Sequence, residues 1–350
     1  MRCVLAFLLA TGLCLADERT SSVVLIIGDG LGVTTLNAAS VYDNVKTEAL
    51  YLYRMPHFAL ADTSAVDDWV TDGAGGTTPL ATGVKTKKGV ISQSADAVWK
   101  IKDGQPLKTI LEYAEEKGLS TGVVTNSGFV DAFPAAFYAH QNGMNQVGGI
   151  LLDLLRPRFG DGVDVVIGAD RIAALRAAQG LGMDLAKEFR RRGYEFLSTV
   201  DQLREQKTLP QRVVVATETT EFDIGPAAHS ALEILGRNPK GFFLMIHSDC
   251  HLKDVERSLK RTVELDNLVR EIVERHRSTL VLVTADHSFG LRIQNGGFGG
   301  NVLQSVLFNG EHTAEEVPVF AAGPGSPAVH GFISNTRVFD VMMQAFGWTR

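Results

Sequence analysis

The chain has 350 residues, of which 45% are hydrophobic and 21% are charged, and its formal net charge is -6. This composition is typical of a globular protein with a large buried core, arranged as one large α/β domain or two smaller ones. Because the chain has no long basic run, we expect neither nucleic-acid binding nor a polybasic membrane patch, and we expect a small soluble partner.

Residues 1–16 have the pattern of a secretory signal peptide. A single arginine precedes an apolar run that ends at Leu15, and a small residue, Ala16, stands before an acidic pair. The run is too short to span a bilayer, and a buried N-terminal strand or helix is the alternative interpretation. Two of the three cysteines lie in this segment, so cysteine usage neither supports nor excludes export. We therefore expect a periplasmic or extracellular protein.

The next stretch, Ser22 to Ile27, is an unbroken run of mostly β-branched residues that ends in Gly28-Asp29-Gly30. Continuous apolar strands are buried on both faces, as in parallel sheets covered by helices. A carboxylate at the carboxyl end of such a strand lies where open α/β sheets bind ligands, which makes Asp29 a candidate site residue. The alternative is that Asp29 caps a helix that begins near Thr34.

A glycine-rich segment follows between Val70 and Gly89. Asp72 leads into three glycines, Gly73, Gly75 and Gly76, and then into a helix-forming stretch. This layout can deliver backbone N–H groups to an oxyanion or a phosphate at a helix N-terminus. A plain turn between a strand and a helix is the competing interpretation.

Strand and helix patterns alternate along the rest of the chain. Further buried strands are expected at residues 121–125, 163–167, 242–246, 279–284 and 317–321, and amphipathic helices at 107–117, 183–192, 227–235, 252–276 and 336–346. This alternation predicts an α/β fold with a doubly wound, mostly parallel central sheet and helices on both faces. No repeat or Pro-rich linker divides the chain, so we expect a single domain from residue 20 to residue 350.

Two of the later segments carry further candidate ligands. Asp286 and His287 follow the buried strand at 279–284, and a carboxylate beside an imidazole suits a divalent ion such as zinc or manganese. His312 precedes the strand at 317–321, and a lone histidine there is more often structural than functional.

Six segments in the same order resemble the alkaline phosphatase family and cover nearly all of the chain after the signal. They are Ile-Gly-Asp29-Gly-Leu-Gly, Thr-Asp72-Gly-Ala with Ala-Thr-Gly-Val-Lys-Thr, Asp131-Ala-Phe-Pro-Ala-Ala, Lys240-Gly-Phe-Phe-Leu-Met-Ile, Thr284-Ala-Asp286-His287 and Glu311-His312-Thr. The resemblance implies an alkaline-phosphatase-like core. In that family, two zinc ions and one magnesium ion surround a serine nucleophile that hydrolyses phosphate monoesters.

The resemblance assigns ligands residue by residue. Asp29 matches the carboxylate shared by the second zinc and the magnesium, Asp286 and His287 match the other ligands of that zinc, and His312 matches a ligand of the first zinc. By the same comparison, the expected anion-binding residues are Asp72, Gly73, Ala74 and Asp131.

Other positions depart from the family pattern. The serine is replaced by Gly73, and a magnesium-binding threonine by Phe133. A Glu, an Asp and a His that bind magnesium and the first zinc are replaced by His247, Leu252 and Glu256, and no arginine lies within residues 141–145, where the phosphate clamp is expected. Leucine and phenylalanine cannot bind a hard cation, so we expect one zinc site and no magnesium site.

These losses predict a protein with a degenerate active site that binds a metal ion and a phosphate-like anion, with little or no phosphomonoesterase turnover. The resemblance also allows a homodimer. The alternative is an active phosphoric monoester or diester hydrolase in which a metal-bound hydroxide attacks directly. His247, with Asp249 and His251, would then rebuild the metal site, and Thr77 or Thr78 is a weaker substitute for the nucleophile.

Overall fold

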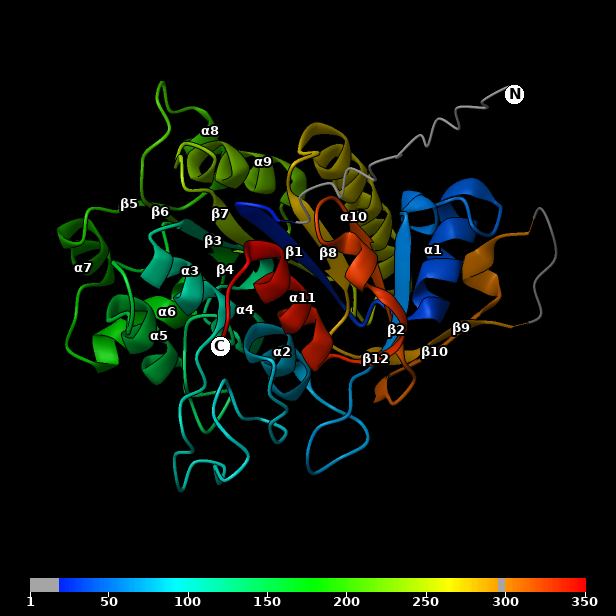
Figure 1. The fold of residues 1–350 in the computed structure, drawn as a ribbon, viewed down its shortest axis with the longest axis horizontal. Coiled ribbons are helices and arrows are strands. Elements are labelled where there is room, and N and C mark those ends of the chain that lie inside the picture. Colours follow the sequence, from blue (N-terminus) through cyan, green and yellow to red (C-terminus); the bar gives the residue numbers. More distant parts are fainter. Residues whose placement is uncertain (1–18, 295–299) are drawn as a thin grey trace, which may run out of the picture.

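A ten-stranded sheet forms the centre of the computed structural model, which describes residues 19–294 and 300–350 (Figure 1). The strand order is β12-β2-β11-β8-β1-β7-β3-β4-β6-β5. The strands of this sheet are β1 (Ser22–Asp29), β2 (His57–Asp62), β3 (Ser120–Gly128), β4 (Val165–Ala169), β5 (Glu195–Leu197), β6 (Val213–Ala216), β7 (Phe242–Asp249), β8 (Leu280–Thr284), β11 (Val317–Ala322) and β12 (His330–Ser334). The expected signal peptide, residues 1–16, lies outside the described residues.

The sheet is mostly parallel, which confirms the predicted fold class. Among its described strands only β11 is reversed, because it pairs antiparallel with both β2 and β8. β1 lies at the centre, between β7 and β8, and every one of its residues from Val23 to Ile27 is fully buried. A strand buried on both faces needs helices above and below it, which explains its unbroken apolar sequence.

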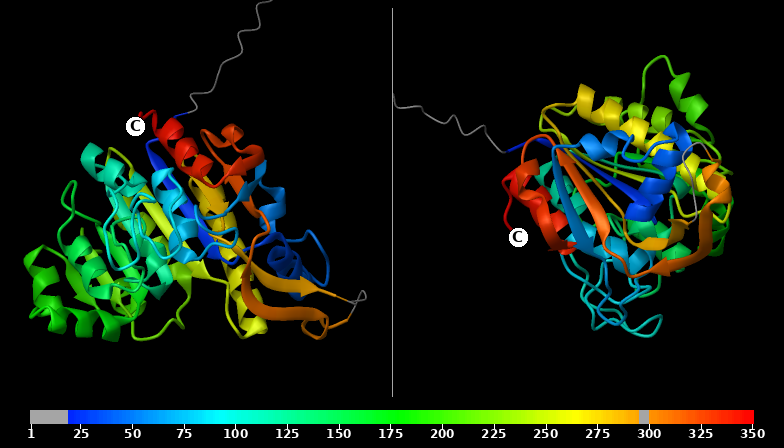
Figure 2. Two further views of the ribbon diagram at one scale, coloured as in Figure 1. Left: turned by 90° about the horizontal axis from the view of Figure 1, so that it is seen from below. Right: turned by 90° about the vertical axis from the view of Figure 1, so that its right-hand side faces the viewer.

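Helices cover both faces of the sheet (Figure 2). Helices α1, α9 and α10 pack together on one face, and α2, α3 and α11 pack together on the other. The helices are α1 (Val33–Asn44), α2 (Gly73–Thr82), α3 (Ile110–Lys117), α4 (Ala132–Ala135), α5 (Val147–Leu155), α6 (Arg171–Gly180), α7 (Leu185–Arg191), α8 (Val200–Arg204), α9 (Ile224–Leu235), α10 (Val255–Arg275) and α11 (Thr336–Phe346), with short 3-10 turns at Tyr51–Arg54, Val302–Gln304 and Ser326–Ala328.

A separate pair of antiparallel strands, β9 (Ser288–Ile293) and β10 (Val306–Thr313), extends beyond the carboxyl end of β8 (Figure 1). In this pair His312 lies opposite Phe289. The pair therefore brings His312 back to the end of the main sheet where Asp286 and His287 stand. Within the described residues, no helix is both long and apolar enough to cross a bilayer.

Candidate metal centre

The carboxyl ends of three neighbouring strands meet at one edge of the sheet. Asp29 ends β1, Asp249 lies opposite it at the end of β7, and Asp286 and His287 follow β8. Since β1 lies between β7 and β8, the sheet topology alone brings these side chains together. This is the edge at which open α/β sheets bind ligands.

Asp29, Asp286 and His287 form the first group of candidate ligands, and their ligand atoms all lie within 4.8 Å of one another. His287 Nε2 lies 3.2 Å from Asp29 Oδ1 and 3.4 Å from Asp286 Oδ2. All three residues are buried, and these atoms have no hydrogen-bond partner in the described structure. Buried polar atoms without partners are costly and rare, so this arrangement fits a bound cation.

The charges in this group are strongly coupled. Burial, assisted by the neighbouring carboxylate of Asp29 and opposed by the charge of His287, raises the pKa of Asp286 to about 7. Burial also opposes ionisation of Asp29, but the close contact with His287 and its charge outweigh burial and lower the pKa of Asp29 to about 2. Burial lowers the pKa of His287, and the two carboxylates outweigh burial and raise it to about 9. The pocket therefore favours a positive charge between the carboxylates.

His251, His287 and His312 form a second group, again with ligand atoms within 4.8 Å of one another. The rings of His287 and His312 stack with centroids 3.6 Å apart, and the His251 ring meets the His312 ring edge-on at 5.0 Å. His251 and His312 are only partly buried, whereas His287 is fully buried. A ligand would therefore reach the centre from the side of His251 and His312.

His247 belongs to neither of the two groups of candidate ligands. Its Nδ1 lies 2.9 Å from Thr125 Oγ1 on β3, and its ring stacks on Phe133 with centroids 4.6 Å apart. Burial lowers its pKa to about 4, so the imidazole is neutral at neutral pH. His247 Nε2 is buried without a partner.

The glycine-rich segment is helical from Gly73 to Thr82. Asp72 is the N-cap of α2, and its carboxylate accepts a hydrogen bond from the Gly75 N–H at 2.8 Å. A Cβ added to Gly76 would overlap the backbone carbonyl of Asp286, whose carbon would lie at 2.9 Å. At Gly76, therefore, glycine allows α2 to approach the strand-end residues closely.

Gly73, the residue for which the sequence resemblance predicts the place of the family's serine, is covered by Phe133. A Cβ on Gly73 would come within 3.0 Å of three carbon atoms of the Phe133 ring. The two nearby threonines are fully buried, and Thr78 Oγ1 is already bonded to Val90 O and the Ser92 N–H. Thr77 Oγ1 is buried without a partner. Neither threonine hydroxyl therefore stands at position 73, where the resemblance predicts the serine.

Asp131 is engaged by its own loop. Its Oδ2 accepts hydrogen bonds from Ser127 Oγ at 2.8 Å and from the Gly128 N–H at 2.9 Å. Burial raises its pKa, and the charge of Asp170 acts in the same direction. These contacts give Asp131 a structural role in the turn after β3. Ala74 is buried in the first turn of α2.

Glu256 and Leu252, which the sequence resemblance places at two ligand positions of the first zinc, lie outside both groups. Glu256 accepts a hydrogen bond from the Tyr42 hydroxyl at 3.0 Å and pairs with Lys260 at 3.3 Å. Leu252 donates its backbone N–H to Ser258 Oγ at 2.9 Å at the start of α10. Asp249 pairs with the buried Arg261 at 3.5 Å, and burial raises its pKa to about 6.

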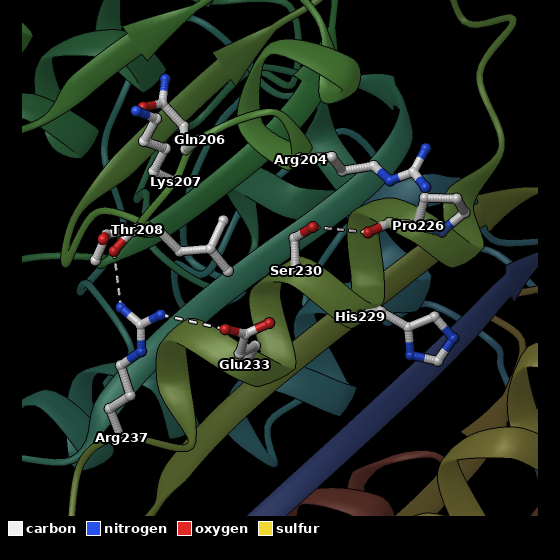
Figure 3. A pocket seen from close by; sticks show the side chains of 10 residues that line it. Arg204, Gln206, Lys207, Thr208, Pro226, His229, Ser230, Glu233 and Arg237 are labelled. Atoms are coloured by element: carbon white, nitrogen blue, oxygen red, sulfur yellow. Dashed lines mark hydrogen bonds and ion pairs between the residues drawn. The ribbon is translucent and has the colours of Figure 1, made fainter.

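A hollow of about 620 Å³ lies elsewhere, between α8, the segment that follows it and one side of α9 (Figure 3). Its lining includes Arg204, Lys207, His229 and Arg237. Arg237 pairs with Glu233 inside the hollow at 3.4 Å, and His229 pairs with Glu271 at 2.8 Å. None of its lining residues belongs to the two ligand groups.

Comparison with known proteins agrees with the fold. The profile of the alkaline phosphatase family matches residues 20–306. The streptomycin-6-phosphate phosphatase of Streptomyces griseus is 28% identical, with 95% of this chain and 93% of that protein covered. The alkaline phosphatase of Escherichia coli (strain K12) is 27% identical, with 95% of this chain and 87% of that protein covered.

Solved structures show the same architecture. The cold-active alkaline phosphatase of a psychrophilic Shewanella species matches with a TM-score of 0.79 and 22% identity, and 93% of this chain and 99% of that chain are covered. The Thermus thermophilus alkaline phosphatase matches with a TM-score of 0.78 and 19% identity, and 98% and 96% of the two chains are covered. At these identities the likeness concerns the fold.

Proposed function

Because the chain belongs to the alkaline phosphatase family, we propose that it binds one divalent ion, with zinc expected, and a phosphate-like anion, and that it has little or no phosphomonoesterase turnover. The observation that carries the metal-binding part is the set of buried atoms without partners, Asp29 Oδ1, both carboxylate oxygens of Asp286 and His287 Nε2. Carboxylate oxygen with imidazole nitrogen is a ligand combination that zinc accepts.

The low turnover is supported by Gly73 and Phe133. Gly73 has no side chain that could attack phosphorus, and the Phe133 ring fills the space that a serine Cβ would need. Without a nucleophile, a covalent phosphoenzyme cannot form. Phe133 also stacks on His247, so the two residues that replace magnesium ligands contact each other. This contact supports the proposal that the magnesium site is lost.

The anion is expected on the partly exposed side of the centre, near His251 and His312. A bound divalent ion would attract an anionic oxygen and polarise it as a Lewis acid. The residues of this chain would hold the ion and leave that side open. A phosphate or sulfate group has the charge for such a position.

A second candidate function is hydrolysis of a phosphoric monoester or diester by direct attack of water. The specific observation in its favour is the accessible histidine pair, since His251 and His312 stand beside the buried carboxylates where a water could be positioned. All four relatives in the comparison are named as phosphatases. This candidate differs from the first in a single measurable property, which is turnover.

Export is the expected localisation, and it rests on the composition of residues 1–16. Mass determination of the protein purified from its native host tests this part of the proposal. A mature N-terminus near residue 17 is expected, and a retained Met1 would contradict it.

The metal-binding part is tested by elemental analysis of the purified protein after dialysis. We expect about one tightly held divalent ion per chain, because His287 takes part in both ligand groups and its Nδ1 is engaged by Ser288 O, which leaves one ring nitrogen for an ion. Two or more tightly bound ions would contradict a single site. No bound ion after incubation with zinc would contradict the proposal itself.

A further inference from the structure

His251 stands outside the ligand positions that the family resemblance assigns, yet it faces the same centre. We propose that His251 is a metal ligand and that one ion lies between Asp29 and the three histidines His251, His287 and His312. This inference rests on the proposed function, since it assumes that an ion binds at all. His251 would compensate for Leu252, which cannot coordinate a metal ion, and for Glu256, which lies outside both ligand groups.

The first support is the tautomer that the hydrogen bonds select. His251 Nε2 lies 3.0 Å from the backbone carbonyl of Gly310, to which it can only donate, so its Nδ1 carries the free lone pair. His312 Nδ1 lies 2.9 Å from Thr71 O, and His287 Nδ1 lies 3.0 Å from Ser288 O. Each of the three rings is thus anchored on a carbonyl through one nitrogen, as metal-bound histidines are.

The second support is the spacing of the ligand atoms. His251 Nδ1 lies 3.8 Å from Asp29 Oδ1, and Asp29 Oδ1 lies 3.2 Å from His287 Nε2. Two ligands bound to one tetrahedral zinc at about 2.0–2.1 Å are roughly 3.4 Å apart. The observed distances are close to the edges of one such coordination polyhedron. The ligand atoms of His251, His287 and His312 lie within 4.8 Å of one another. One ion can therefore contact these histidines and Asp29 once side-chain movements shorten the longer of these separations.

The third support is the way in which the protein holds His251 in place. Its ring packs against Phe289 with centroids 4.6 Å apart. Gly30 has a positive φ of 65°, and a Cβ there would lie 3.1 Å from the Cβ of His251. The missing side chain at position 30 thus leaves room for the histidine beside the end of β1.

This ligand set predicts a preference among metals. Three imidazoles, of His251, His287 and His312, lie beside the carboxylate pair, and imidazole suits zinc, cobalt or nickel better than magnesium or calcium. Loss of His251 should therefore weaken the binding of zinc and cobalt. It should have little effect on magnesium, which would be held by carboxylate oxygen.

The test is a competition titration of the metal-free full chain with Zn²⁺ against a chromophoric chelator. We expect His251→Ala to bind Zn²⁺ at least ~10-fold more weakly than wild type, since loss of a residue that merely orients a ligand already costs 10–100-fold. The matched control is His229→Ala, which removes an imidazole on α9 that pairs with Glu271 on α10, and it should leave the affinity unchanged.

Equal Zn²⁺ affinity of wild type and His251→Ala would overturn the inference and leave the proposed function standing. No Zn²⁺ binding by wild type would overturn both. If His251→Ala fails to fold, X-ray absorption of the zinc-loaded wild type decides. Three imidazoles around zinc are expected, and two or fewer would contradict the assignment of His251.

Discussion

The Phe133 ring lies where the first side-chain carbon of any residue larger than glycine at position 73 would be, with three ring carbons within 3.0 Å of that point. Glycine at position 73 and phenylalanine at position 133 therefore depend on each other in the packing. The ring rests in turn on His247, at a centroid distance of 4.6 Å. Restoring the serine alone would disturb this arrangement before it could restore any chemistry.

Gly73→Ser should consequently destabilise the protein. Forcing extra atoms into a packed site typically costs about 1–3 kcal/mol, and α2 is buried along its whole length. Urea unfolding should show a lower transition midpoint, and hydrolysis of an activated aryl phosphate should stay near background. The matched control is Gly180→Ser, because a Cβ at Gly180 would meet nothing within 4 Å.

The cost of Gly73→Ser should shrink when Phe133 is also replaced by alanine, because the overlapping ring is then gone. A double-mutant cycle measures this coupling, which for residues in contact is about 0.5–3 kcal/mol. Additive effects of the two substitutions on the free energy of unfolding would show that the ring does not block position 73.

Metal removal should lower the thermal stability. With free zinc at 100 times its dissociation constant, binding adds about 2.7 kcal/mol to the free energy of unfolding. A gain of that size corresponds to a rise in Tm of about 4 °C for a chain of this size. Differential scanning calorimetry of zinc-loaded and chelator-treated protein measures the difference.

The substitution Asp286→Asn distinguishes a loss of ion binding from a general loss of stability. In the ion-free protein this change removes a buried charge that faces Asp29 without a hydrogen-bond partner, so the Tm should stay equal or rise. Zinc should then raise the Tm of the variant far less than that of wild type. An equal zinc-induced rise in both proteins would place the ion elsewhere.

Glu115 makes stability depend on pH. It is buried on α3, where its carboxylate accepts hydrogen bonds from Thr121 and the Gly162 N–H, and burial raises its pKa from 4.5 to about 7. Between these values the folded chain holds a proton that the unfolded chain has lost. Stability from this group is therefore present below about pH 4.5 and decreases as pH rises to about 7, by roughly 3 kcal/mol.

Glu115→Gln should remove this dependence, so that the variant gains stability relative to wild type as pH rises from 5 to 8. Urea unfolding at several pH values measures it. Glu116→Gln, at the exposed neighbour that pairs with Lys108, is the control and should show no such gain. A constant difference between wild type and Glu115→Gln across this range would contradict the prediction.

Much of the centre could be predicted from strand-end residues. Asp29, Asp286 and His287 end or follow continuous apolar strands, and the carboxyl ends of parallel strands meet at one edge. The structure places all three together because β1 lies between β7 and β8. The reversed strand β11 and the β9–β10 pair could not be predicted, since pairing direction depends on distant partners.

The positions of the His247 and His251 side chains could not be predicted from the sequence. Apolar residues alone place the end of this strand near Ile246, but β7 continues to Asp249. His247 is therefore inside the strand and faces Thr125 on β3, whereas His251, beyond the end, reaches the ligand groups. The contact between Gly73 and Phe133 joins segments about sixty residues apart, and no local pattern reports it.

The measurement that tests the central claim most directly is the turnover of an activated aryl phosphate by the zinc-loaded wild-type protein. Gly73 and the Phe133 ring that covers it predict a rate near background. A kcat above roughly 1 s⁻¹, within the usual enzyme range, that disappears with chelator and with Asp286→Ala would contradict this account and favour direct hydrolysis at the metal centre.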